Sequence, residues 1–469
     1  MLVSGSPPLP MSRWRTCPDP HNPRPDRMKT FYFLSLGCPK NRVDTEVAVA
    51  SLVRAGYRPV DLPEEADVLV VNTCSFVLDA RTESVEALVE LAEVKTRRPG
   101  ARLVAMGCLG QQAGGELAES LPELDLVLGS GEPASLPALL EEPGPVFHPT
   151  SPRHLPGDAV PRVLTQSPAF AYLKVADGCS RRCAFCTIPS IKGPFESRPI
   201  RALADENRML ADQGVRELVL VAQDLTQFGL PGRRSLLRLL DALEQVPGIA
   251  WIRLMYLYPE GIPDALIERV AAGGKVVPYL DMPLQHVDDR VLRRMRRGTS
   301  ERSIRRVIER VRSASRPIAL RTTFITGHPG EDDAAFRNLE RFVQEVQFEH
   351  LGVFAWSPEE GTHSSTMADP PPAAVRRKRR SALMKLQKRI STVHNRASVG
   401  AVVDVLVEGP SAEHAWVMQG RTQRQAPEVD GIVLLDGFDG RAGDIVSARI
   451  RRAGAYDLVA IPVAARRET

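Results

Sequence analysis

The sequence lacks any long apolar run, which sets the first limits on its class. Its 469 residues contain no stretch of about 18 apolar residues, so no segment is expected to span a membrane. The amino-terminal segment also lacks the apolar core of a signal peptide. Seven cysteines, an odd number, then favour metal-bound thiolates in a reducing compartment over disulfides. These features predict a cytoplasmic protein.

The chain also carries little net charge and no long polar tract outside its beginning. A net charge of +4 excludes a uniformly basic nucleic-acid-binding chain, so any basic surface must be local. Residues 1–28 contain seven prolines and are predicted to form a disordered tail. Residues 148–168, rich in proline and with little periodicity, are interpreted as a linker.

Residues 29–147 are predicted to form an open parallel α/β sheet. Apolar strands are expected at 31–36, 68–72, 102–106 and 124–128. The segments between them have the pattern of helices, with one predicted to begin at residue 44 and another at residue 111. Apolar strands that alternate with helices indicate a sheet covered on both faces.

Residues 169–398 are predicted to form a second α/β domain, a partial (β/α)6 barrel. Its six strand candidates lie at 172–175, 217–221, 251–255, 279–283, 318–324 and 350–355. Catalytic groups in such barrels sit at the carboxyl ends of the strands. Gln223 and Asp224, Gln285 and His286, and Arg321 are polar residues that we assign to strand ends; an ordinary solvated turn is the alternative for each.

Residues 399–466 contain short strand candidates separated by glycine-rich turns, which predicts a small closed barrel of the OB type. Residues 399–463 of this segment carry nine acidic and six basic residues, a net charge of −3. An acidic barrel is poorly suited to a polyanion such as tRNA. It suits a basic protein partner better.

One short motif carries the strongest chemical signal. Residues 177–186 read Asp-Gly-Cys-Ser-Arg-Arg-Cys-Ala-Phe-Cys, so Cys179, Cys183 and Cys186 have C-x3-C-x2-C spacing. Thiolates select iron–sulfur clusters, zinc or copper(I). No nearby Cys or His supplies the fourth ligand of a structural zinc site, and bacterial ferredoxins use a different spacing. The favoured interpretation is a 4Fe–4S cluster with one open iron, and structural zinc is the alternative.

Three further cysteines follow strands of the first α/β domain. Cys38, Cys74 and Cys108 each stand two residues after the end of a predicted strand. Ligands bind outside the carboxyl ends of strands in open α/β sheets, so these thiols are expected to converge. Buried free cysteine acting as a small hydrophobe is the alternative for each one. Three matched positions favour a second 4Fe–4S cluster.

The spacing of Cys179, Cys183 and Cys186 resembles that of the radical S-adenosylmethionine (SAM) enzymes. With the three strand-end cysteines and the small terminal barrel, which resembles a TRAM domain, the chain resembles the methylthiotransferases from about residue 31 to residue 463. The resemblance implies two 4Fe–4S clusters and SAM as cofactors. It also implies an electron donor such as flavodoxin or ferredoxin, and insertion of a methylthio group into an unactivated C–H bond.

Within that family, three motifs resemble the branch that modifies ribosomal protein S12. They are Ser-Leu-Gly-Cys-Pro-Lys-Asn at 35–41, Cys-Thr-Ile-Pro-Ser-Ile-Lys-Gly at 186–193 and Tyr-Leu-Asp-Met-Pro-Leu-Gln-His at 279–286. This branch implies methylthiolation of the β-carbon of an aspartate, with no catalytic residue beyond the cluster ligands. The resemblance assigns Gln223, Asp224 and Arg321 to SAM binding. His328 departs from the family, which usually has Phe in this loop.

Three alternatives remain open at this point. A tRNA adenosine methylthiotransferase would use the same chemistry on a different substrate. A non-catalytic iron–sulfur module that binds RNA would belong to another class. A radical SAM methyltransferase that transfers only carbon would be expected to carry a vestigial first domain, without three matched cysteines.

Overall fold

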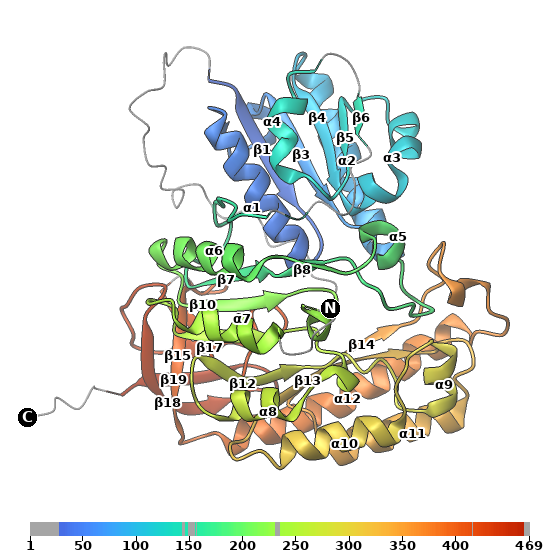
Figure 1. The fold of residues 1–469 in the computed structure, drawn as a ribbon, viewed down its shortest axis with the longest axis vertical. Helices are drawn as coiled ribbons and strands as arrows, with labels where there is room; N and C mark the ends of the chain where they lie inside the picture. The colour runs from blue at the N-terminus through green and yellow to red at the C-terminus, as the bar shows by residue number, and fades with distance from the viewer. Residues whose placement is uncertain are drawn as a thin grey trace, which may run out of the picture. The chain divides into compact units, whose positions relative to one another are not determined.

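The computed structural model describes residues 28–142, 146–148, 155, 157–229, 235–414 and 416–463, which form two compact units (Figure 1). The first unit comprises Met1–Gln166, Ala176–Arg181 and Cys186–Ala202, and the second holds the rest of the chain. The predicted tail, apart from Met28, the first part of the predicted linker and residues 464–466 of the predicted barrel lie outside the described residues. No helix in the described part is long and apolar enough to cross a membrane.

The first unit is built on a parallel six-stranded sheet in the order β2-β1-β3-β4-β5-β6. Its strands are β1 (Thr30–Ser35), β2 (Arg58–Pro59), β3 (Val68–Thr73), β4 (Arg102–Gly107), β5 (Leu126–Leu128) and β6 (Val146–His148). Alternate residues of β3 face opposite sides, so Val70 packs with α1 (Pro39–Arg54) and α4 (Leu136–Leu139), whereas Val71 packs with α2 (Leu78–Arg97) and α3 (Cys108–Ser120). The predicted parallel sheet with helices on both faces is confirmed.

Two helices of this unit begin earlier than the periodicity predicts. We expected the first helix to begin at residue 44, but α1 begins at Pro39, directly after Cys38. We expected another at residue 111, but α3 begins at Cys108. Proline is favoured in the first turn of a helix because its fixed φ suits the helix and its missing N–H is not needed there. Both corrections move a cysteine to the start of a helix.

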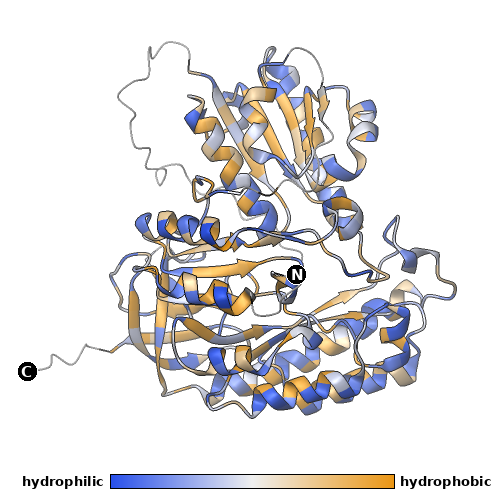
Figure 2. Ribbon diagram, viewed as in Figure 1, coloured by the Kyte–Doolittle hydropathy of each residue, from blue (hydrophilic) through white to orange (hydrophobic). Residues whose placement is uncertain are grey.

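The second unit contains another parallel six-stranded sheet, in the order β14-β13-β12-β11-β10-β7. Its strands are β7 (Phe170–Lys174), β10 (Glu217–Val221), β11 (Trp251–Leu254), β12 (Val276–Asp281), β13 (Ala319–Thr326) and β14 (His350–Ala355). Its helices are α6 (Ile200–Asp212), α7 (Ser235–Glu244), α8 (Asp264–Ala271), α9 (Asp289–Arg294), α10 (Glu301–Arg312), α11 (Asp333–Val346) and α12 (Ala373–Ala397). Figure 2 shows apolar strands and helices with one hydrophilic side, the pattern of a sheet buried by amphipathic helices.

The chain ends in a closed five-stranded barrel, in the order β15-β16-β17-β19-β18, as predicted. Its strands are β15 (Val402–Pro410), β16 (Met418–Thr422), β17 (Val433–Leu435), β18 (Ile445–Ala453) and β19 (Leu458–Pro462). Alternate residues such as Val405, Val407 and Ile450 fill its interior. Gly420 permits close strand contact, because a Cβ there would lie 2.2 Å from the carbonyl oxygen of Leu406.

A buried ion network joins this barrel to the second sheet. The Glu217 carboxylate on β10 lies 2.7 Å from Arg253 on β11 and 2.6 Å from Arg421 on β16. All three side chains are at most 1% exposed. Burial alone would raise the pKa of Glu217, but the two guanidinium groups outweigh it and lower that pKa. The network therefore fixes the barrel against the amino ends of neighbouring strands.

Candidate functional site

Cys38, Cys74 and Cys108 lie beyond the carboxyl ends of the adjacent strands β1, β3 and β4 of the first unit. Gly37, with φ +94°, brings two of their loops together: a Cβ on it would lie 3.1 Å from the Sγ of Cys74. Burial raises the pKa of Cys74 to about 11, and the nearby Cys38 thiol contributes. Burial likewise raises the pKa of Cys108 to about 12, with both other thiols contributing. The three thiols are thus close enough to influence one another.

Two of these cysteines stand at helix amino termini. Cys38 is the N-cap residue of α1, and Cys108 is the first residue of α3. Free backbone N–H groups and the helix dipole at such positions favour negative charge, including that of a thiolate. Gly107, with φ +97°, allows the tight turn into α3, because a Cβ there would lie 2.2 Å from Oδ1 of Asn72. Two helix amino termini therefore lie where the thiols meet.

Asn41 holds the three cysteine loops in register. Its Nδ2 donates to the carbonyl oxygens of Leu36 at 3.3 Å and Thr73 at 3.0 Å, which precede Cys38 and Cys74. Its Oδ1 accepts from the Cys108 thiol at 3.4 Å. Our sequence interpretation missed this role, although Asn41 belongs to the motif at 35–41.

Lys192, which the sequence interpretation also missed, is buried at this site. It ends the short helix α5 (Ile188–Lys192), which packs against α3, and its side chain is 2% exposed. Its Nζ lies 3.6 Å from Asp44 of α1 and 3.5 Å from Asp177 of β8 (Ala176–Asp177). Burial alone would lower the pKa of Lys192, but these carboxylates and the Cys108 thiol raise it. Lys192 belongs to the motif at 186–193, which is the sequence feature that could have identified it.

The donor set suits an iron–sulfur cluster. Among the residues that the structure describes, no three His, Cys, Asp or Glu side chains are grouped to hold a single metal ion. In a 4Fe–4S cluster each thiolate binds a different iron, so the thiols need to surround a volume rather than meet at a point. Three thiols beyond the ends of three adjacent strands, two of them at helix amino termini, suit that arrangement.

In the C-x3-C-x2-C loop, Cys179 belongs to the first unit and is 9% exposed. Its N–H donates to the carbonyl oxygen of Gly193 at 3.0 Å, and its Sγ accepts from the N–H of Arg181 at 3.4 Å. Gly178, with φ +73°, is required before it, because a Cβ there would lie 2.1 Å from the carbonyl oxygen of Pro194. Backbone N–H donation to sulfur favours the thiolate form of Cys179.

Cys183 belongs to the second unit and lies against a cation. Nη1 of Arg297 donates to its sulfur at 3.6 Å, and the same guanidinium stacks 4.2 Å from the ring centroid of Tyr258. The backbone of Ala184 is bonded on both sides, donating to Met295 at 2.9 Å and accepting from Ser364 at 2.7 Å. This segment is therefore held rigidly. Cys186, the third cysteine of the loop, is partly exposed.

The residues assigned to SAM have different surroundings. Asp224 follows the carboxyl end of β10 and is 3% exposed; its carboxylate accepts from the N–H of Thr226 at 3.0 Å and from Nε2 of Gln227 at 2.9 Å. Gln223 directly precedes it, at the edge of the sheet where catalytic groups are expected.

Arg321, by contrast, is near the amino end of β13. It pairs with Asp281 at 2.9 Å and lies 3.5 Å from Asp430 of the barrel. These carboxylates outweigh burial and raise the pKa of Arg321. Its assignment to SAM stays a prediction, and a structural role in joining sheet and barrel is the alternative.

His328, the residue that departs from the family, is fully buried beyond the carboxyl end of β13. Its ring lies edge-on to Phe185 of the cysteine loop at 6.5 Å and to Trp356 at 6.2 Å. Burial lowers its pKa to about 4. It is therefore a neutral imidazole that takes the place of an apolar ring.

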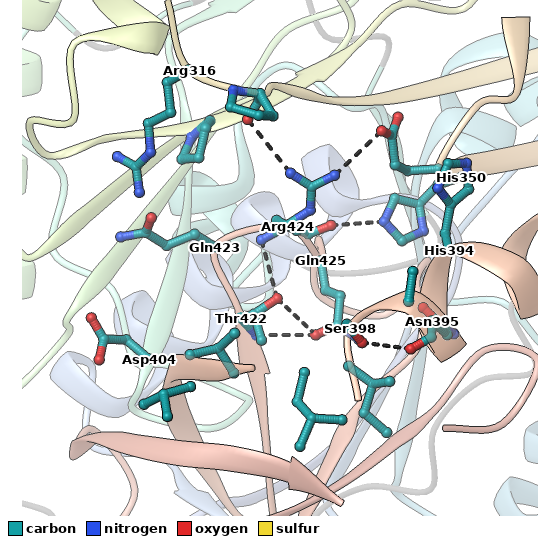
Figure 3. A pocket seen from close by; sticks show the side chains of 18 residues that line it. Arg316, His350, His394, Asn395, Ser398, Asp404, Thr422, Gln423, Arg424 and Gln425 are labelled. Atoms are coloured by element: carbon teal, nitrogen blue, oxygen red, sulfur yellow. Dashed lines mark hydrogen bonds and ion pairs between the residues drawn. The ribbon is translucent and has the colours of Figure 1, made fainter. Parts of the chain in front are cut away.

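A cavity of about 570 Å³ lies at the opposite edge of the second sheet (Figure 3). It is lined by Pro278, His350 and the Arg316–Pro317 turn at the amino ends of strands, and by Arg424 of the barrel. Arg424 donates to Glu349 at 3.3 Å across it, and His350 bonds to the Arg424 carbonyl oxygen at 2.7 Å. This cavity belongs to the packing of barrel on sheet, since the chemistry of parallel α/β sheets sits at the carboxyl ends.

Family models match three parts of the chain. Residues 30–129 match the uncharacterized protein family UPF0004, residues 173–343 the radical SAM superfamily and residues 399–463 the TRAM domain. A solved radical SAM methyltransferase, TsrM from Kitasatospora setae, has a TM-score of 0.50 at 15% identity, covering 70% of this chain and 75% of its own. That likeness shows the fold alone.

Curated relatives match almost the whole chain. RimO, the ribosomal protein uS12 methylthiotransferase, of Anaeromyxobacter sp. (strain K) is 47% identical over 92% of this chain and 93% of its own. RimO of Trichlorobacter lovleyi is 44% identical over 91% and 96%, and RimO of Geobacter sulfurreducens 42% over 91% and 97%. The chain therefore belongs to the RimO family of radical SAM methylthiotransferases.

Proposed function

We propose that this protein methylthiolates the β-carbon of an aspartate in ribosomal protein uS12, using SAM and two 4Fe–4S clusters. The observation that carries the proposal is the 47% identity to a uS12 methylthiotransferase across 92% of the chain, which includes both three-cysteine sets. Bound clusters and SAM would supply the radical and the sulfur-transfer chemistry. The chain would supply the cluster ligands, position the reacting groups and exclude water from them.

The first cluster would be held by Cys38, Cys74 and Cys108. Their thiols are buried or half-buried, so metal binding must displace protons from Cys74 and Cys108, whose pKa values burial raises. The amino termini of α1 and α3 favour the resulting negative charge. Asn41 keeps the three loops at fixed separation.

The second cluster would be held by Cys179, Cys183 and Cys186. The Arg297 guanidinium lies beside the sulfur of Cys183 and would partly balance the negative charge of a cluster bound there. Gln223 and Asp224, which follow the carboxyl end of β10 in the unit that also contains Cys183, are our candidates for binding the amino group of SAM. We expect the Asp224 carboxylate to keep its orientation through its bonds to Thr226 and Gln227.

The terminal barrel is our candidate for docking the basic substrate protein. Seven of its acidic side chains but only four of its basic ones are classed as exposed, so its accessible surface keeps a net charge of −3. Complementary potentials accelerate encounter and select the partner. With a ribosomal substrate we also expect a cytoplasmic location and a flavodoxin or ferredoxin as electron donor.

The direct test offers both substrate classes to the anaerobically reconstituted enzyme with SAM and a reductant. We expect uS12 to gain the mass of a methylthio group on one aspartate, while tRNA stays unchanged by nucleoside mass spectrometry. A modified adenosine together with unmodified uS12 would overturn the substrate assignment and favour the tRNA enzyme. No modification of either substrate by enzyme that holds both clusters would count against methylthio transfer itself.

A further inference from the structure

Among the described residues, Lys192 is the only buried lysine whose Nζ has no hydrogen-bond acceptor. Two carboxylates nevertheless lie within ion-pair distance of that Nζ. Asp44 and Asp177 lie 3.6 and 3.5 Å away, within electrostatic range but outside a hydrogen bond between nitrogen and oxygen. Three N–H donors on one ammonium group are thus left for something else. A buried charge that lacks hydrogen bonds is expensive, so such an arrangement needs an explanation.

The surroundings of the ammonium group indicate where those donors point. Lys192 ends α5, which packs against α3, and α3 begins with Cys108. Among the charged groups that act on the Cys108 thiol, Lys192 has the largest effect, and Lys192 also interacts electrostatically with Cys38. Its two carboxylate neighbours come from α1, which Cys38 caps, and from β8, two residues before Cys179. The ammonium therefore lies beside the amino-terminal thiol set, held by carboxylates on either side.

We propose that Lys192 is a positioning residue of the amino-terminal cluster site, whose ammonium donates N–H···S hydrogen bonds to sulfur atoms of the cluster that Cys38, Cys74 and Cys108 would hold. This inference rests on the proposed function. Hydrogen bonds to sulfur and nearby positive charge stabilise the more negative, reduced form of a cluster and raise its reduction potential. Asp44 and Asp177 keep the ammonium charged and directed at the sulfur instead of bonding to it.

The test measures the reduction potential of that cluster alone. In a Cys179→Ala, Cys183→Ala, Cys186→Ala background, only the amino-terminal cluster can load, and iron analysis with electron paramagnetic resonance follows it during a redox titration. Lys192→Met keeps the length of the side chain without its charge or donors. At the midpoint of the parent protein, we expect the ratio of reduced to oxidised cluster to fall at least about tenfold, a shift of about 59 mV for one electron.

A matched control and two further variants separate charge from folding. Lys95→Met removes a lysine of the same unit that pairs with Asp125 at 2.6 Å, and should leave the potential unchanged. Lys192→Arg keeps the charge and should stay near the parent value. Lys192→Met combined with Asp177→Asn removes both charges of one ion pair. Comparing the potential of this double variant with that of Asp177→Asn alone isolates the effect of the ammonium, even where Lys192→Met by itself binds little iron.

Each outcome decides the matter. Equal potentials for Lys192→Met and Lys95→Met would overturn the inference while leaving the proposed function intact. Iron could be lost from Lys192→Arg as well as from Lys192→Met and from Lys192→Met with Asp177→Asn. Lys192 would then be a packing residue, which also overturns the inference. Loss of iron from the two variants with Lys192→Met, while Lys192→Arg and Lys95→Met keep their iron, would support the inference, because the positive charge is then needed at the site. A triple-alanine parent without any iron would refute the amino-terminal cluster, and the inference with it.

Discussion

The buried imidazole of His328 gives a quantitative test of how the loop after β13 is built. Its side chain is 0% exposed, and its Nδ1 donates to the Pro329 carbonyl oxygen at 3.0 Å. Its Nε2 has no hydrogen-bond partner within the described structure. Phe185 and Trp356 present ring edges to it at 6.5 and 6.2 Å. Protonation would therefore place a charge among aromatic rings.

The magnitude follows from the difference between the folded and unfolded pKa of His328. Burial lowers the pKa from 6.5 to about 4; the Pro329 carbonyl opposes this shift, while His286 and Arg294 add to it. Between these two pH values the unfolded chain binds a proton that the folded chain does not, so stability falls as pH falls. At about 1.36 kcal/mol per pH unit, the loss is roughly 2 kcal/mol by pH 5 and about 3 kcal/mol by pH 4.

His328→Phe removes this titration and keeps a ring of similar size. We expect the variant to gain stability relative to the wild type by roughly 2 kcal/mol between pH 7 and pH 5, because only the wild type loses stability at this site. The measurement is urea unfolding of metal-free, reduced protein at pH 7, 6 and 5, followed by tryptophan fluorescence of the second unit.

His363→Phe is the control, since the His363 side chain is exposed, at the start of the short 3₁₀ turn His363–Thr366. This control should leave the pH dependence of the wild type unchanged. A constant stability difference between His328→Phe and the wild type from pH 7 to pH 5 would refute the argument that a buried neutral imidazole fills this place.

Three further predictions address the clusters, the barrel and its joint to the sheet. Reconstituted wild type should hold about eight iron per chain. Replacing Cys38, Cys74 and Cys108 with Ala should leave about four iron and retain SAM cleavage, but sulfur transfer should be lost. A triple variant that keeps all its iron would contradict the first cluster site. Glu217→Gln should cost about 3–5 kcal/mol in denaturant unfolding, because two buried guanidinium groups lose their shared carboxylate; a change below about 1 kcal/mol would contradict the network. Reversing the exposed Asp436 and Asp439 to Lys should slow association with uS12 several-fold at low salt and leave SAM cleavage intact, whereas faster association would contradict docking on the acidic barrel.

The strands could be predicted from the sequence because burial on both faces leaves a continuous apolar run. The predicted ranges 217–221 and 350–355 coincide with β10 and β14, and the remaining core strands differ by a few residues at their ends. The start of α1 could not be predicted in this way. Its first two turns bury Lys40, Asn41 and Asp44, so polar residues occupy positions where a periodic pattern requires apolar ones. Asn41 and Asp44 are buried against Thr73 and Lys192, which are distant in the sequence, and no local pattern distinguishes such burial from exposure.

Arg321 is a second position that the sequence pattern could not interpret correctly. A charged residue after an apolar run is ordinarily interpreted as the end of a strand, which places it near the cofactor. In the structure β13 continues for five residues beyond Arg321, to Thr326, and the guanidinium pairs with Asp281 and approaches Asp430 of the barrel.

Glu217 and Arg253 are likewise charged residues inside strands, and their partners also lie at the amino ends of the strands or in the barrel. A charge within an apolar strand thus indicates a buried partner, because an unpaired buried charge is too costly to keep. It cannot indicate which partner, since residues 321 and 430 meet only after the barrel has docked on the sheet. Glu217, Arg253 and Arg321 therefore join the two parts of the unit, whereas Gln223 and Asp224 follow the opposite, carboxyl end of β10.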